Sequence, residues 1–96
     1  MSLLTTIRDR REDILRVARR HGASNVRIFG SLARGDDDGA SDVDFLVDFG
    51  KGHSLLDRAA LAVALEDLLG HQVDVATERA LRSRIRGRVL KEAVPL

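Results

Sequence analysis

The segment from Asp42 to Phe49 constrains the fold most, because its side chains alternate between two chemical kinds. Valine and phenylalanine stand at every second position, and three of the four positions between them are aspartate. Successive side chains of a β-strand point to opposite faces of the sheet. The pattern therefore predicts a strand over 41–49, with one apolar face packed on a core and one acidic face.

The acidic face of this strand predicts a cation site. Asp42 and Asp44 would point the same way with Cα atoms roughly 6.5–7 Å apart, where two carboxylates repel each other. A hard divalent cation relieves that repulsion, and Mg²⁺ takes carboxylate oxygens together with water and phosphate oxygens. Asp74 stands between two valines in a second short strand, predicted over 72–76. If the two strands are neighbours, three carboxylates converge, an arrangement that suits two-metal phosphoryl or nucleotidyl transfer.

The remaining elements follow from apolar periodicity, capping residues and β-branched runs. Helices are predicted over 6–21, from 54 to 70, and from Thr77 to Pro95; a strand is predicted over 25–29, and a helical turn over 31–34. About eleven residues join the first two strands, which is marginal for a parallel crossover, whereas a full helix separates the last two. We therefore expect an α+β fold in which helices and strands alternate, with a small mixed β-sheet packed by helices mainly on one face.

Gly30 and Ser31, which end the first strand, predict a phosphate site. Glycine lets the backbone approach a phosphate closely, and the N–H groups and the serine hydroxyl can bind oxygens. Arg34 either neutralises a triphosphate or forms a salt bridge to the loop at Asp36–Asp38. A P-loop is excluded, because Asp36 and Asp37 follow Gly35 where that motif needs Lys and Ser or Thr.

Composition narrows the classes of function. The chain has 96 residues, no cysteine and three phenylalanines as its only aromatic residues, so thiol chemistry is excluded and base stacking is disfavoured. We expect one domain over 1–96 in the cytoplasm, with no membrane contact, and nucleic acid as an unlikely partner. Aspartates cluster in the middle of the chain and arginines near its end, which indicates a cation and an anion as ligands.

The stretch "GSLARGDDDGASDVDFLV" resembles the signature of the polymerase β-like nucleotidyltransferase superfamily. That signature is Gly-Ser, Arg-Gly, a variable loop, and Ser-Asp-x-Asp before apolar residues. "VDV" at 73–75 matches the third acid of that family. The short chain is similar to the minimal nucleotidyltransferases, which are antitoxin partners of HEPN-domain toxins. The resemblance implies a nucleotidyltransferase-like core and the transfer of AMP from ATP, with Mg²⁺ as two ions, to a tyrosine hydroxyl of a HEPN toxin.

The residues that would carry this chemistry fall into two sets. The catalytic and metal-binding set is Asp42, Asp44 and Asp74. The nucleotide- and phosphate-binding set is Gly30, Ser31 and Arg34.

Three other functions stay open from the sequence. The same fold could neutralise the toxin by occlusion without catalysis, although intact acids favour an enzyme. It could adenylylate a small molecule, although no second domain forms an acceptor pocket. The arginine-rich final helix could bind nucleic acid, with a strongly salt-dependent affinity. A homo-oligomer is compatible with each of these functions.

Overall fold

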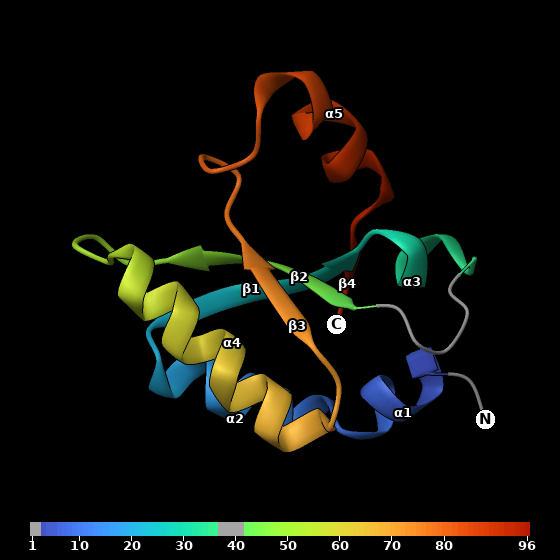
Figure 1. Ribbon diagram of the computed structural model, residues 1–96, viewed down its shortest axis with the longest axis vertical. Helices are drawn as coiled ribbons and strands as arrows, with labels where there is room; N and C mark the ends of the chain where they lie inside the picture. The colour runs from blue at the N-terminus through green and yellow to red at the C-terminus, as the bar shows by residue number, and fades with distance from the viewer. Residues whose placement is uncertain (1–2, 37–41) are drawn as a thin grey trace.

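The computed structural model describes residues 3–36 and 42–96, and these form one mixed sheet with helices on both faces (Figure 1). The strands lie in the order β3-β2-β1-β4. Strand β2 pairs antiparallel with β1 and parallel with β3, and β4 pairs antiparallel with β1. The predicted α+β class and mixed sheet are confirmed. The strand bounds are Ala23–Phe29 for β1, Val43–Phe49 for β2, Val73–Ala76 for β3 and Val94–Pro95 for β4.

Five helices surround the sheet within the described residues. Their bounds are Leu3–Asp9 for α1, Arg11–Arg20 for α2, Ser31–Arg34 for α3, Leu55–Leu69 for α4 and Ser83–Glu92 for α5. Helix α4 begins as the sequence predicts, because the backbone N–H of Ser54 donates a 2.7 Å hydrogen bond to Asp57. None of the helices in the described ranges is long and apolar enough to cross a lipid bilayer.

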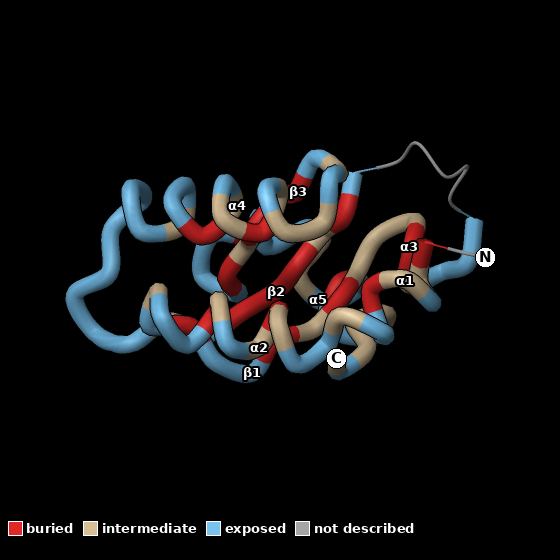
Figure 2. The backbone as a smooth tube through the Cα atoms, turned by 90° about the horizontal axis from the view of Figure 1, so that it is seen from below, coloured by how far each residue is buried: buried red, intermediate tan, exposed pale blue. Residues whose placement is uncertain are grey.

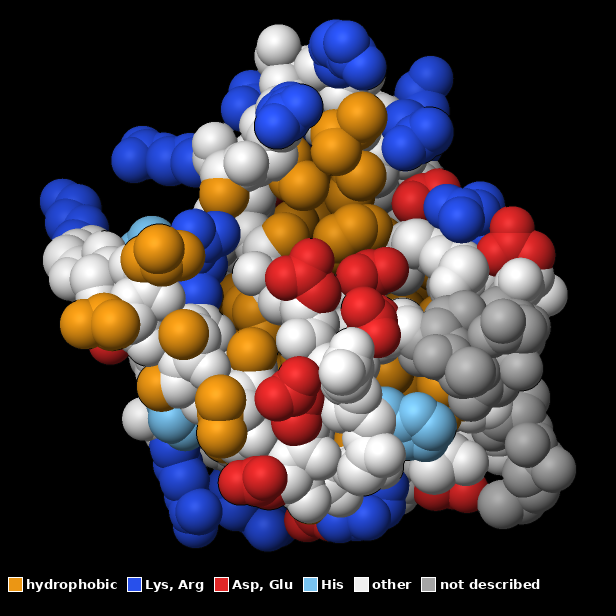
Figure 3. All heavy atoms as spheres, in the orientation of Figure 1, with side chains coloured by type: hydrophobic (Ala, Val, Ile, Leu, Met, Phe, Trp, Pro, Cys, Tyr) orange, Lys and Arg blue, Asp and Glu red, His pale blue; other side chains and the backbone are white. Residues whose placement is uncertain are grey.

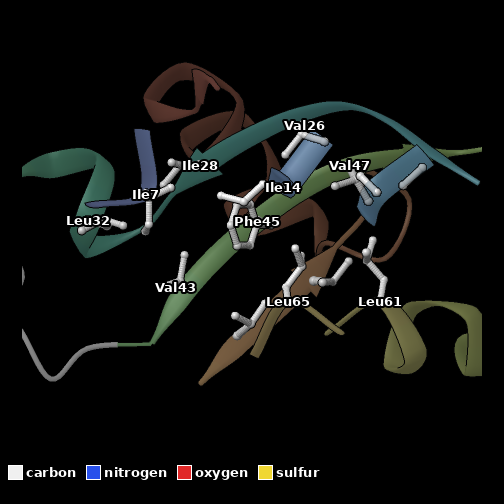
Figure 4. Packing of buried hydrophobic residues seen from close by; sticks show 14 of the residues in the cluster. Ile7, Ile14, Val26, Ile28, Leu32, Val43, Phe45, Val47, Leu61 and Leu65 are labelled. Atoms are coloured by element: carbon white, nitrogen blue, oxygen red, sulfur yellow. The ribbon is translucent and has the colours of Figure 1, made fainter. Parts of the chain in front are cut away.

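The main core lies between one face of the sheet and helices α1, α2 and α4. The apolar face of β2 forms its centre, since Val43, Phe45 and Val47 are buried there. Figure 4 shows Phe45 among Ile7 and Ile14, which come from the first two helices, and Leu65 of α4. Burial is concentrated along the strands, and the outer turns of α4 are exposed (Figure 2). The alternating side chains of β2 therefore place one apolar face on the core, as the sequence predicts.

Helix α5 covers part of the opposite face through a second, smaller apolar cluster. Leu46 of β2 is fully buried there against Leu81 and Val89. The acidic face of β2 is thus apolar at its middle position, where α5 packs on it. The prediction that helices pack mainly on one face holds for α1, α2 and α4, and α5 is the exception.

Several predicted boundaries are wrong, and three of them concern helices. The helix predicted over 6–21 is two helices that meet at Arg10, whose backbone leaves the helical region (φ −100°, ψ 16°). The turn lets α1 reach α3, whereas α2 lies along β1. The final helix begins at Ser83, because Thr77 instead accepts the N–H of Ala80 (3.3 Å) and closes a turn. Pro95 lies in edge strand β4, where its missing N–H does no harm.

Candidate active site

The parallel pairing of β2 and β3 brings two predicted site residues side by side. Asp44 and Asp74 are directly paired positions in the register, so their side chains leave the same face of the sheet. That face is the one on which α5 packs, because the neighbouring pair, Leu46 and Ala76, belongs to the cluster beneath this helix. The condition that the sequence left open, that the strands of Asp44 and Asp74 are neighbours, is therefore met.

Asp42 and Asp44 differ in their surroundings although they are only two positions apart. Asp42 is exposed and immediately precedes β2, so it lies outside the strand that was predicted to include it. Asp44 is half-buried, and the pKa of its carboxyl is raised from 3.8 to about 6, chiefly by burial and also by the charges of Asp74 and Asp42. The two neighbouring aspartates thus add to the cost of charging Asp44.

Gly30 permits the close approach of Asp44 to the end of β1. Phe29 is paired with Asp44 across the antiparallel strands, so the next residue begins beside that carboxylate. A Cβ on Gly30 would overlap Oδ2 of Asp44 and lie 3.2 Å from its Cγ. The Gly30 backbone also adopts φ 79° and ψ −156°, a combination that is essentially confined to glycine. Any side chain at position 30 would displace Asp44 or the turn.

Ser31 and Arg34 begin and end the single turn α3, next to Gly30. Of the two roles that the sequence left open for Arg34, the structure shows the salt bridge. Its guanidinium pairs with Asp36 at 3.1 Å, which is the salt bridge to the acidic loop, while Asp37 and Asp38 lie outside the described residues. It also pairs at 3.2 Å with Glu92, the last residue of α5. Both partners raise the pKa of Arg34 above its ordinary value.

Glu92 is the site residue that sequence reasoning missed. Its Oε1 accepts the backbone N–H of Gly30 at 3.1 Å, and its charge contributes to the raised pKa of Asp44. No motif marks it, because it is far from Gly30 along the chain and reaches the site only through the packing of α5. A charged side chain near the end of a helix otherwise looks like an ordinary solvated residue.

The donor set fits a hard cation. Within residues 3–36 and 42–96, no group of three or more histidine, cysteine, aspartate or glutamate side chains is arranged to hold a metal ion. The side chains as they stand are therefore not a closed ligand cage. They do supply only carboxylate oxygens, which Mg²⁺ prefers, and their mutual repulsion is what a bound cation would relieve.

The surface around these acids is divided into acidic, apolar and basic regions. Figure 3 shows acidic side chains gathered at the centre of one face, next to an apolar patch, with Lys and Arg side chains beyond it over α5. A separate cavity of about 540 Å³ lies near the far ends of β2 and β3, lined by residues that include Phe49, His53 and Arg79. It is remote from the carboxylates and has no part in the chemistry described below.

Known proteins resemble the chain over most of its length. A family model described as "Nucleotidyltransferase domain" matches residues 11–96. The Methanocaldococcus jannaschii protein named "Putative protein adenylyltransferase MJ0435" is 41% identical over 88 residues, which are 92% of this chain and 95% of that protein. Protein adenylyltransferase MntA of Thermococcus cleftensis is 44% identical over 75 residues, which are 78% of this chain and 76% of that protein.

Solved structures share the fold. One, described as the structure of a "putative minimal nucleotidyltransferase", has a TM-score of 0.85 and 53% identity, and the match covers 100% of this chain and 97% of that one. Another is a tri-AMPylated HEPN toxin of Shewanella oneidensis in complex with an MNT antitoxin, with a TM-score of 0.70. That match covers 92% of this chain and 69% of that one, and at 19% identity it bears on the fold alone.

Proposed function

The chain belongs to the nucleotidyltransferase domain family. We propose that it transfers AMP from Mg²⁺–ATP to a tyrosine hydroxyl of a HEPN-type toxin, and that this transfer neutralises the toxin. The enzyme class follows from the family and from relatives named protein adenylyltransferase. The toxin as acceptor is our inference by analogy with a protein of the same fold, the antitoxin in complex with an AMPylated HEPN toxin.

The observation that carries the proposal is the meeting of Asp44 and Asp74 on one face, with Gly30 pressed against the first of them. A purely structural sheet gains nothing from this arrangement, because the charge on Asp44 is costly in the metal-free fold. A site that receives a cation recovers that cost, because the cation neutralises the carboxylates and then attracts the triphosphate.

We propose that Asp42, Asp44 and Asp74 bind the metal, as two Mg²⁺ ions. When bound, magnesium would neutralise charge on the phosphate oxygens as it develops. The turn at Gly30–Ser31 and the guanidinium of Arg34 would hold the outer phosphates, which leave together. The chain's own groups thus fix the nucleotide by its phosphates.

The reaction is an in-line displacement at the α-phosphorus. The acceptor hydroxyl oxygen forms a bond to this phosphorus, the bond to the bridging oxygen breaks, and pyrophosphate leaves with the electron pair. The hydroxyl loses its proton. Asp74, which comes from a different strand than Gly30–Ser31, would act on the acceptor side, either as a ligand of the second metal ion or as the acceptor of this proton. The atoms balance, with AMP on the acceptor and one proton released.

Occlusion of the toxin without catalysis is the alternative, and one observation favours it. Leu55, Leu56 and Val63 of α4 are 69%, 79% and 55% exposed, which gives this helix an apolar outer face suited to protein contact. Binding through that face would need none of the three aspartates.

The test is to incubate the chain with its cognate HEPN protein, Mg²⁺ and ATP, and to measure the intact mass and the activity of the toxin. We expect the toxin to gain AMP on tyrosine and to lose activity in step with this gain. A parallel incubation with α,β-methylene-ATP, which cannot release AMP, is the control. If the toxin is silenced equally in the control, occlusion is correct and the catalytic proposal is wrong.

A further inference from the structure

The end of α5 reaches into the site through one side chain, Glu92. Its Oε1 accepts the backbone N–H of Gly30 at 3.1 Å, and its two oxygens accept Nη1 of Arg34 at 3.3 and 3.2 Å. The side chain is only 16% exposed, so this is an enclosed contact and not a passing surface pair. The carboxylate therefore holds a backbone donor and a cation that stand beside Asp44.

The fold fixes this contact from both sides of Glu92. The residue that follows it, Ala93, donates its N–H to Val89 at 2.9 Å and so closes α5. Strand β4 then pairs with β1, and the N–H of Leu96 donates to Val26 at 3.0 Å. Strand β1 is the one that runs into Gly30. The pairing that anchors the end of the chain therefore also sets where Glu92 stands relative to the turn.

We propose that Glu92 is an internal counter-anion of the phosphate-binding donors, and that a bound triphosphate must take Arg34 from it. The inference rests on the proposed function, because it assigns the occupant of the same site. A phosphate oxygen and a carboxylate oxygen recruit the same donors, and a triphosphate would be a third anion at a guanidinium that already pairs with Asp36 and Glu92. Glu92 is thus a positioning residue that keeps Gly30 and Arg34 in place before nucleotide arrives and opposes nucleotide binding by its charge.

The substitution Glu92→Gln separates charge from shape. Glutamine keeps an oxygen that can accept the Gly30 N–H, so the turn keeps its anchor and the chain keeps its fold. It loses the negative charge that competes for Arg34. The proposal therefore predicts tighter nucleotide binding, whereas a residue that only supports the fold would give unchanged or weaker binding.

Two matched variants control for the loss of a charge. Glu78→Gln also removes one carboxylate from a glutamate–arginine pair, the 3.1 Å pair with Arg27, and it lies away from Gly30. Asp36→Asn removes the other carboxylate partner of Arg34, which is 59% exposed and makes no contact with Gly30 among the described interactions. We expect no change in affinity for the first and a smaller gain than that of Glu92→Gln for the second.

The experiment is titration calorimetry of the full chain with Mg²⁺ and α,β-methylene-ATP, repeated with tripolyphosphate and no metal. We expect Glu92→Gln to raise both affinities about threefold or more, the size of a partly exposed charge interaction. In the background Arg34→Gln, most of this gain should disappear, because the carboxylate then has no guanidinium to compete for. Unchanged or weaker binding by Glu92→Gln, or a full gain in the Arg34→Gln background, would overturn the inference.

A measurement on the wild-type chain gives a second test that needs no variant. The Arg34 guanidinium and the Glu92 carboxyl should both shift their NMR resonances as α,β-methylene-ATP saturates the chain with Mg²⁺ present. Saturation without a shift at either group contradicts the inference while leaving the proposed function intact. If the wild-type chain binds no nucleotide at all, the proposed function fails, and this inference fails with it.

Discussion

Asp44 is the residue at which stability and function oppose each other. Its carboxyl has a pKa of about 6 in the folded chain and an ordinary value of 3.8 when unfolded. Between these two values the folded state binds more protons than the unfolded state, so this group makes stability fall as pH rises through that window. Below the window the penalty is absent, and above it the penalty is complete.

The substitution Asp44→Asn should therefore stabilise the metal-free chain above pH 6, by about 1–2 kcal/mol after screening by solvent is allowed for, and by almost nothing near pH 3.5. The measurement is urea unfolding in the presence of a chelator at both pH values, with Asp67→Asn, an exposed aspartate of α4, as the control. A destabilised Asp44→Asn chain at pH 7 would mean that the carboxylate supports the fold.

Asp74 and Ser31 are predicted to act at opposite ends of the reacting phosphates. Asp74→Asn should slow the single-turnover rate by about a hundredfold or more and leave Mg²⁺–ATP affinity mostly in place, because a group on the acceptor side acts in the chemical step. Ser31→Ala should mainly weaken ATP binding, by the loss of one hydrogen bond. The check is to measure affinity and single-turnover rate for both variants. A loss of ATP affinity in Asp74→Asn as complete as in Asp44→Asn would show that the acids form one binding unit.

The positions of single site residues could mostly be predicted from the sequence, because the spacing in a strand decides to which face a side chain points. The period of two puts Asp44 and Leu46 on one face, and the structure agrees. Asp74 is predicted as its neighbour only on the condition that the strands pair, and they do. Glu92 is different, since its place depends on a helix and an edge strand that no local pattern links to Gly30.

Among the elements, the turn from β1 into α3 is the one that tolerates least change. Gly30→Ala should cost about 2–4 kcal/mol of unfolding free energy and weaken Mg²⁺–ATP binding, because the new Cβ would overlap Asp44 in a glycine-only conformation. Gly35→Ala is the matched control: it shares a positive φ of 78° but would meet no described atom within 4 Å, so we expect about 1 kcal/mol. Equal losses in the two variants would show that only backbone conformation matters at Gly30.

Element boundaries were harder to predict than element types, and each error has a local cause. Apolar periodicity continues across Arg10, so it cannot reveal that the chain turns there to serve two surfaces. Thr77 looks like a helix cap because a capped turn and a capped helix begin with the same hydrogen bond. The two residues of β4 are too few to show a period, and only their pairing with β1 defines them as a strand.

On the scale of the fold, α5 packs on the sheet apart from the main core. It rests on the small cluster around Leu46, whereas the other face of the sheet holds the main core. A ligand that joins the carboxylates to Arg34 therefore links strands β2 and β3 to the turn α3. Nucleotide binding should stabilise this end of the sheet.

We accordingly expect Mg²⁺ with ATP to raise the melting temperature by more than the sum of the shifts that either gives alone. The cation and the triphosphate would each complete the site for the other, so their effects are not independent. Thermal unfolding monitored by circular dichroism measures this, with Ca²⁺ as a comparison cation. Strictly additive shifts would indicate two unrelated weak sites.

Transfer of AMP by this chain, and the need for Asp44 in that transfer, can be measured directly. The experiment supplies the cognate HEPN toxin and Mg²⁺ with ATP labelled either at the α- or at the γ-phosphate, using the wild-type chain and Asp44→Asn. Covalent label on the toxin is predicted from α-labelled ATP with the wild-type chain alone, while the γ-label leaves as pyrophosphate. Label transferred from the γ-phosphate, or α-label transferred equally by Asp44→Asn, would show that the chain does not transfer AMP through Asp44.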